Sequence, residues 1–192
     1  MLLTTGLVIF IATHLFTAYA RGPRAALVAR LGDGPYKGLY SLVSLAGFVL
    51  LVMGWKRTVP EAVYTPPDWG VQLAYPLMVV TFILFTAAYL PAGRIKSLAG
   101  HPMSVGTILG SLAHLLVNGD SRSVTVFGSF FLWGVADRFS YRLRGDSGAS
   151  GRSMVGDLGA IVGGLISSSI VVHYLHRHLS GVPLDPARVF GG

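Results

Sequence analysis

Two histidines inside apolar segments are the residues best suited to chemistry in this chain. His14 lies in the apolar run of residues 2–20, and His114 lies in the segment 100–120. At 3.6 residues per turn, one stripe of the second segment carries Thr107, Gly110, Ser111, His114 and Asn118. A helix in lipid turns such a stripe toward protein, because a polar group without a partner in hydrocarbon costs several kcal/mol. An ionisable side chain in this position predicts a functional site.

Two neutral imidazoles from different helices suit a haem iron. Each offers a nitrogen lone pair, and a flat apolar macrocycle fits between helices. Gly110 and Ser111, beside His114, would leave room for such a ring. By helical rise, His14 lies about 9 Å from the Ala20 end of its segment and His114 about 18 Å from Pro102, so a shared site is permitted but not required. Zinc is disfavoured because it takes three or four protein ligands, and the spans offer no third. For each histidine alone, a packing role is the alternative.

The remaining histidines and two basic residues have two interpretations each. His101 precedes Pro102 at a helix start, about 140° around the helix from His114, and is either an interfacial residue or a contact to the polar head of a ligand. Arg94 and Lys96 either hold haem propionates or form a basic cytoplasmic loop. Three more histidines end the last helix and read as solvated cations, although one of them, His176, could face a site; they are His173, His176 and His178.

Composition defines the class of protein. Of 192 residues, 52% are hydrophobic and 12% charged, against about 25% charged in a soluble domain. We therefore expect an all-α, polytopic integral membrane helical bundle that forms one domain. The absence of cysteine excludes disulfides, thiolate haem ligation and cysteine zinc sites. The net charge of +7 lies in arginine-rich loops, which indicates membrane topology and contact with anionic lipid rather than nucleic-acid binding.

Six apolar segments are expected to cross the membrane, at about 2–20, 38–55, 71–90, 102–118, 123–136 and 155–179. A short surface helix is expected over 24–31, broken by Gly32–Pro35. Small residues at every fourth position of the last segment (Gly159, Gly163 and Ser167) predict close helix packing. Lysine and arginine number ten in the loops after the first, third and fifth segments and five elsewhere. This bias predicts that those loops lie in the cytoplasm and that both termini lie on the opposite side of the membrane.

Several short motifs run along nearly the whole chain. They include Tyr64-Thr65-Pro66-Pro67, Gly93-Arg94-Ile95-Lys96, Gly100-His101-Pro102-Met103, Ala113-His114-Leu115-Leu116-Val117-Asn118-Gly119-Asp120 and the segment Trp133–Arg138. With these motifs the chain resembles the NnrU family of membrane proteins. That resemblance implies a multi-pass protein of the bacterial inner membrane, with both termini in the periplasm. It also implies a role in denitrification and nitric-oxide metabolism.

The same fold family includes the plant 15-cis-zeta-carotene isomerase, a haem b membrane enzyme with two histidine ligands. The resemblance places those ligands at His14 and His114. It implies a redox change that releases one axial ligand, and a function in isomerising an apolar polyene or handling nitric oxide. The His-Pro motif also resembles isoprenylcysteine-type methyltransferases, but their acidic, tyrosine-rich C-terminal motif is missing, so methyl transfer is the weaker reading. A membrane accessory protein without a cofactor is the non-enzymatic alternative. The sequence contains no GxSxG, P-loop or dinucleotide-binding motif.

Overall fold

The computed structural model describes residues 1–181, which form helices joined by short loops. Within this range there is no β-strand, only an isolated bridge between Ala62 and Asp120. The helical elements are α1 (Leu2–Tyr19), α2 (Arg21–Leu31), α3 (Asp33–Arg57), α4 (Gly70–Tyr89), α5 (Arg94–Ala99), α6 (Pro102–Val117), α7 (Ser121–Leu143), α8 (Met154–Ile170), the π-helical turn η1 (Val171–Leu175) and α9 (His176–Ser180). The all-α prediction is confirmed. The helices form two compact units, Met1–Val59 and the chain from Pro60 onward.

The first unit is built on close contact between α1 and α3, with α2 connecting them. Glycines make that contact possible. A Cβ atom on Gly6 would lie 2.3 Å from the Leu51 nitrogen, and one on Gly54 would lie 2.2 Å from the Leu3 nitrogen. The two backbones therefore approach each other at positions that exclude any side chain, as small residues allow in membrane helices.

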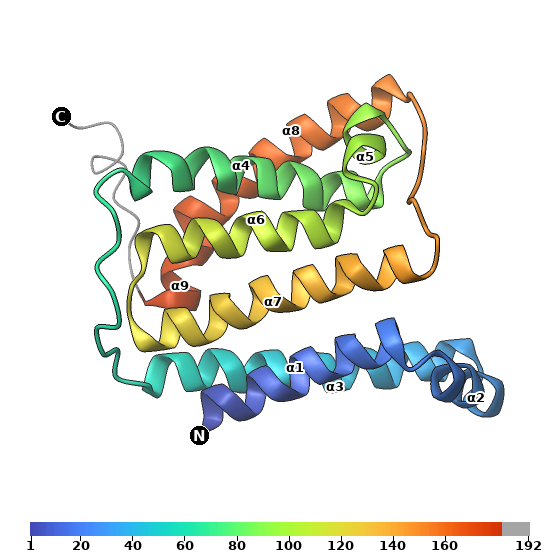
Figure 1. Cartoon of the computed structure of the whole chain (residues 1–192), viewed down its shortest axis with the longest axis horizontal. Helices are drawn as coiled ribbons and strands as arrows, with labels where there is room; N and C mark the ends of the chain where they lie inside the picture. Colours follow the sequence, from blue (N-terminus) through green and yellow to red (C-terminus); the bar gives the residue numbers. More distant parts are fainter. Residues whose placement is uncertain (182–192) are drawn as a thin grey trace. The chain divides into compact units, whose positions relative to one another are not determined.

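In the second unit, α4 packs against both α6 and α8, and α6 packs against α7 (Figure 1). Small residues again mark the contacts. A Cβ on Gly106 of α6 would meet the Phe85 ring of α4 at 2.7 Å, and one on Gly164 of α8 would meet the Ile83 Cα of α4 at 2.6 Å. The buried stripe of α8 is Gly156, Ala160, Gly164 and Ser168. Small residues do recur at every fourth position, as expected. The buried ones, however, lie one residue further along the helix than the predicted Gly159, Gly163 and Ser167.

Hydrogen bonds tie the loops of the second unit together at its two ends. At one end the Gly119 carbonyl accepts from the Val63 and Tyr64 amides, and the Ser121 amide donates to the Glu61 carbonyl at 2.8 Å. At the other end the Ser153 amide donates to the Ala92 carbonyl at 3.1 Å. The Asp157 carboxylate accepts from the Arg94 and Ile95 amides, both at 2.9 Å, and so caps α5.

The helix boundaries correct three expectations. α3 begins at Asp33 rather than Gly38, because Gly32 (φ 84°) alone ends the α2 segment and Pro35 fits in the first turn of the next helix. α7 continues to Leu143, seven residues past the expected end at Ala136, since its charged last turns remain helical. The basic loop after α4 contains the short helix α5. The first backbone amides of α5 donate hydrogen bonds to the Asp157 carboxylate. The surface helix expected over 24–31 exists as α2.

The length and composition of the helices identify a membrane protein. Four helical segments in the described part of the chain are long and apolar enough to cross a bilayer: α1, α3, α4 and Met154–Ser180. α6 has 16 residues and is shorter than a typical span. The expected membrane helical bundle is therefore confirmed, while the number of six crossings stays a prediction.

Candidate functional site

His114 lies about three turns beyond the buried start of α6 and is half-buried within the second unit. Its imidazole stacks on the Phe127 ring of α7, with 3.9 Å between ring centroids and 5° between planes. One turn earlier, Ser111 is 4% exposed. One turn later, the Asn118 side-chain amide donates to the His114 carbonyl at 3.0 Å and closes the end of the helix. The imidazole plane is thus held by an aromatic neighbour and a fixed backbone.

The second imidazole beside His114 belongs to His176. The two ring centroids are 6.4 Å apart and the planes differ by 5°. His176 is half-buried, whereas His173 and His178 are exposed. The π-helical turn η1 directly precedes His176, and single π turns inside helices recur at functional sites. The structure therefore brings His114 and His176 together in one unit.

The room that Gly110 was expected to leave for a ring beside His114 is occupied by a neighbouring helix. A Cβ on Gly110 would meet the Thr81 Cγ2 of α4 at 3.0 Å, so Gly110 serves the contact between α6 and α4. The absence of a side chain at Gly110 is used for helix packing. Phe127 was not identified from the sequence, because an aromatic residue in an apolar run carries no signal for a ligand site.

His14 lies in the first unit, in a cluster of aromatic rings. Its Nδ1 donates to the Phe10 carbonyl at 2.7 Å, because a carbonyl can only accept. The ring centroids of Phe10 and Tyr40 lie 4.3 and 5.5 Å from that of His14. A neutral imidazole that donates from Nδ1 carries its lone pair on Nε2, and this type of hydrogen bond orients histidine ligands in metal sites. His14 belongs to the first unit and His114 to the second.

A polar cavity of about 290 Å³ in the second unit contains two of the predicted residues, Lys96 and His101. The His101 imidazole stacks on Tyr141 with 3.5 Å between centroids. Its Nε2 lies 3.1 Å from the main-chain oxygen of Asp146 and 3.5 Å from the Asp146 carboxylate. The cavity therefore holds an imidazole fixed beside a carboxylate.

Arg94 and Lys96, the two basic residues predicted to hold haem propionates, make contacts within the protein. The Lys96 ammonium donates to the Ala88 and Leu90 carbonyls at 2.8 and 2.9 Å, which anchors α5 to the end of α4. Arg94 contributes its backbone amide to Asp157 and does not line the cavity. Tyr141 and Asp146 were missed because one ends a long helix and the other lies in a Gly/Ser-rich loop.

The similarity of the sequence to known protein families decides which family the chain belongs to. The model of the NnrU protein family matches residues 2–184. The chain belongs to the NnrU family. No curated protein and no solved structure matches it. The match contains every candidate residue of this NnrU protein, from His14 to His178, and confirms the family predicted from the motifs.

Proposed function

We propose that this NnrU membrane protein binds haem b and that His114 would hold its iron. The observation that carries the proposal is the held imidazole of His114, stacked on Phe127 with the His176 ring 6.4 Å away. In residues 1–181 no group of three histidines or acids comes together. Haem requires only one or two imidazoles from the protein, whereas zinc takes three or four ligands. His114 and His176 offer the number of imidazole donors that haem takes.

The residues around His114 would orient the ligand. Phe127 fixes the plane of the imidazole by stacking, and the Asn118 amide fixes the backbone carbonyl of His114. The family resemblance also implies His14 as a haem ligand, and within its own unit the hydrogen bond from Nδ1 of His14 to the Phe10 carbonyl sets the tautomer with the lone pair on Nε2. His176 is the alternative second ligand within the unit that holds His114.

Bound haem would supply an iron whose redox state changes how strongly it binds its ligands. We propose that the protein uses this property either to isomerise an apolar polyene or to handle nitric oxide in denitrification. Membership of the NnrU family supports the nitrogen-oxide role. The apolar outer faces of the long helices support access for a substrate that partitions into lipid.

Absorption spectra of the detergent-purified protein test the proposal. The wild type, expressed with ample haem supply, should show a Soret band in both the oxidised and reduced states. We expect His114→Ala to lose most of this band. Either His14→Ala or His176→Ala should convert a six-coordinate spectrum into a five-coordinate one and so identify the second ligand. His178→Ala removes an exposed histidine from the same helix as His176 and serves as the matched control.

A colourless wild type would overturn the haem proposal. A spectrum unchanged by His114→Ala would overturn the assignment of the ligand. In the first case the protein would be a membrane accessory protein in which His114 packs against Phe127 without a cofactor. Addition of nitric oxide to the reduced protein, or of a cis polyene under reducing conditions, then separates the two haem-dependent roles.

A further inference from the structure

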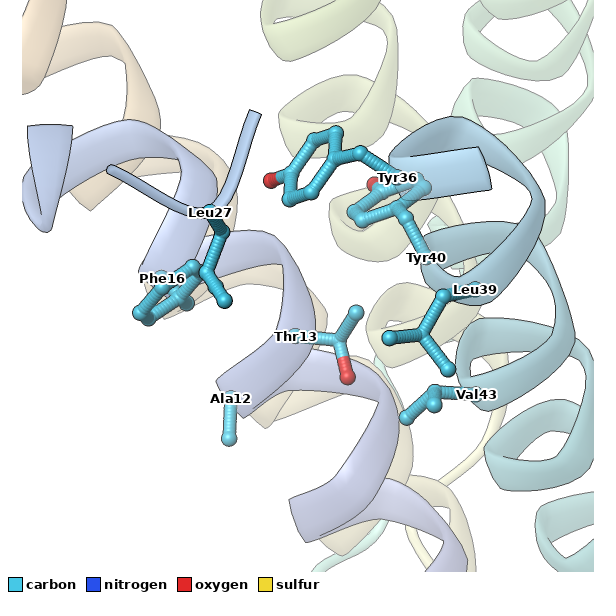
Figure 2. Close-up of a pocket in the computed structure, with 8 residues that line it drawn as sticks. All are labelled: Ala12, Thr13, Phe16, Leu27, Tyr36, Leu39, Tyr40 and Val43. Atoms are coloured by element: carbon cyan, nitrogen blue, oxygen red, sulfur yellow. The ribbon is translucent and has the colours of Figure 1, made fainter. Parts of the chain in front are cut away.

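The first unit contains an apolar cavity of about 300 Å³ between α1, α2 and α3. Figure 2 shows Phe16, Leu27 and Tyr36 toward one end of it, and Ala12 and Val43 toward the other. From Tyr36 to Val43, α3 advances by about 10 Å. The cavity therefore extends along the helices, and its length suits a segment of an extended hydrocarbon chain.

Tyr36 is the one side chain of this cavity with a polar atom that lacks a partner in the described structure. The residue is 6% exposed, and its hydroxyl is buried without a hydrogen bond. The hydroxyl of Thr13, which also lines the cavity, already donates to the Ile9 carbonyl at 2.7 Å. Burial of a hydroxyl without a partner is costly, and such groups usually indicate an absent partner. Figure 2 shows the Tyr36 side chain extending from α3 toward Leu27 and Phe16.

Positive charge lies over the Tyr36 ring. The Arg24 guanidinium carbon is 5.8 Å from the centre of the Tyr36 ring. The α2 helix carries three arginines and no acid. The acid that follows it, Asp33, is paired with Lys37 at 2.6 Å. The entrance at α2 is therefore complementary to an anion, and cationic helices of this kind attract anionic lipids.

We propose that this cavity binds one acyl chain of an anionic phospholipid. The acyl chain of the lipid lies between α1 and α3. The Tyr36 hydroxyl donates to an oxygen of the glycerol ester, and the lipid phosphate faces Arg24. Charge complementarity and the unpartnered hydroxyl both select this occupant over a plain hydrocarbon. The site consists of residues of the first unit alone and is independent of haem binding by His114.

Native mass spectrometry of the full-length, delipidated protein tests this proposal with dioleoyl phosphatidylglycerol and dioleoyl phosphatidylcholine as probes. We expect the wild type to retain phosphatidylglycerol more tightly. Tyr36→Phe removes one oxygen atom and should weaken its binding by roughly fivefold to tenfold, because one hydrogen bond to a charged or polar acceptor is lost. Arg24→Gln should weaken phosphatidylglycerol and leave phosphatidylcholine unchanged.

Two matched controls distinguish this site from general attraction to lipid. Arg30→Gln removes the same charge from the same helix, and Tyr89→Phe removes the hydroxyl of a tyrosine that is 82% exposed. Both variants should bind like the wild type. Equal binding of the two lipids, an effect of Arg30→Gln as large as that of Arg24→Gln, or wild-type binding by Tyr36→Phe would each overturn the proposal. Because none of these changes alters the haem ligands, loss of lipid with an intact Soret band separates this inference from the proposed function.

Discussion

At the scale of single residues, Tyr64 joins a loop to the end of the helix that carries His114. Its hydroxyl donates to the Leu115 carbonyl and, at 3.0 Å, to the Asn118 carbonyl. Partial burial raises the pKa of Tyr64 above its usual value, and the negative charge of Asp120 raises it further. The phenol must keep its proton to donate, so this contact depends on pH.

Tyr64→Phe should lower the free energy of unfolding by about 1 kcal/mol near neutral pH, the net value of one hydrogen bond. Because the folded-state pKa lies above the unfolded value, the contribution of the protonated phenol is present in full below about pH 10 and is lost as the pH rises through the folded-state pKa. The difference in thermal unfolding midpoint between wild type and variant should therefore stay constant up to about pH 10 and shrink as the pH rises further. A difference that begins to shrink well below about pH 10, or that never shrinks above it, would contradict the role assigned to the proton.

At the scale of helices, glycines set the distance between α1 and α3. A Cβ on Gly47 would lie 2.8 Å from the Phe10 nitrogen, whereas a Cβ on Gly38, in the same helix, meets nothing within 4 Å. The two positions differ in packing but share the same backbone conformation. Alanine substitutions at these two positions therefore distinguish the free-energy cost of a steric clash from the intrinsic helix preference of alanine.

Gly47→Ala should lower the free energy of unfolding by about 1–3 kcal/mol, because the α1 backbone must move away. Gly38→Ala should leave it unchanged or raise it by up to about 1 kcal/mol, since alanine loses less conformational freedom than glycine. Thermal unfolding in detergent checks both. Equal destabilisation by the two variants would contradict the close packing of α1 and α3.

The same helices show which features the sequence can predict. The length of the apolar runs identified the helical segments, and short sequence motifs identified the family. Both signals are local patterns in the sequence. The end of α7 was predicted too early, since charged residues such as Arg138 leave lipid without leaving the helix. The neighbours of His114 could not be derived, because Phe127 and His176 reach it from other helices. The shift of the α8 stripe by one residue has the same cause: the rotation of a helix is decided by its partner.

At the scale of the whole molecule, the loops of the second unit sort into two groups. Loop residues 61–64 bond to residues 119–121, and Ala92 bonds to Ser153. The loops before α4 and after α6 thus lie at one end of that unit, and the loops after α4 and before α8 lie at the other. This pairing fits α4, α6, α7 and α8 as antiparallel crossings. It fits four crossings in this unit, while the total of six stays a prediction because α6 is short and α7 is not among the helices apolar enough to span a bilayer.

Cysteine scanning tests this topology, because the chain has no cysteine of its own. Glu61→Cys and Ser150→Cys lie at exposed positions at opposite ends of the second unit, and Gly22→Cys is an exposed position after α1. The excess of lysine and arginine places the loops after the first, third and fifth spans in the cytoplasm. A membrane-impermeant maleimide added to cells with a permeable outer membrane should therefore label Glu61→Cys alone, and lysis should expose the other two. Labelling of Ser150→Cys together with Glu61→Cys before lysis would mean that these loops share one face of the membrane, and the six-span arrangement would be wrong.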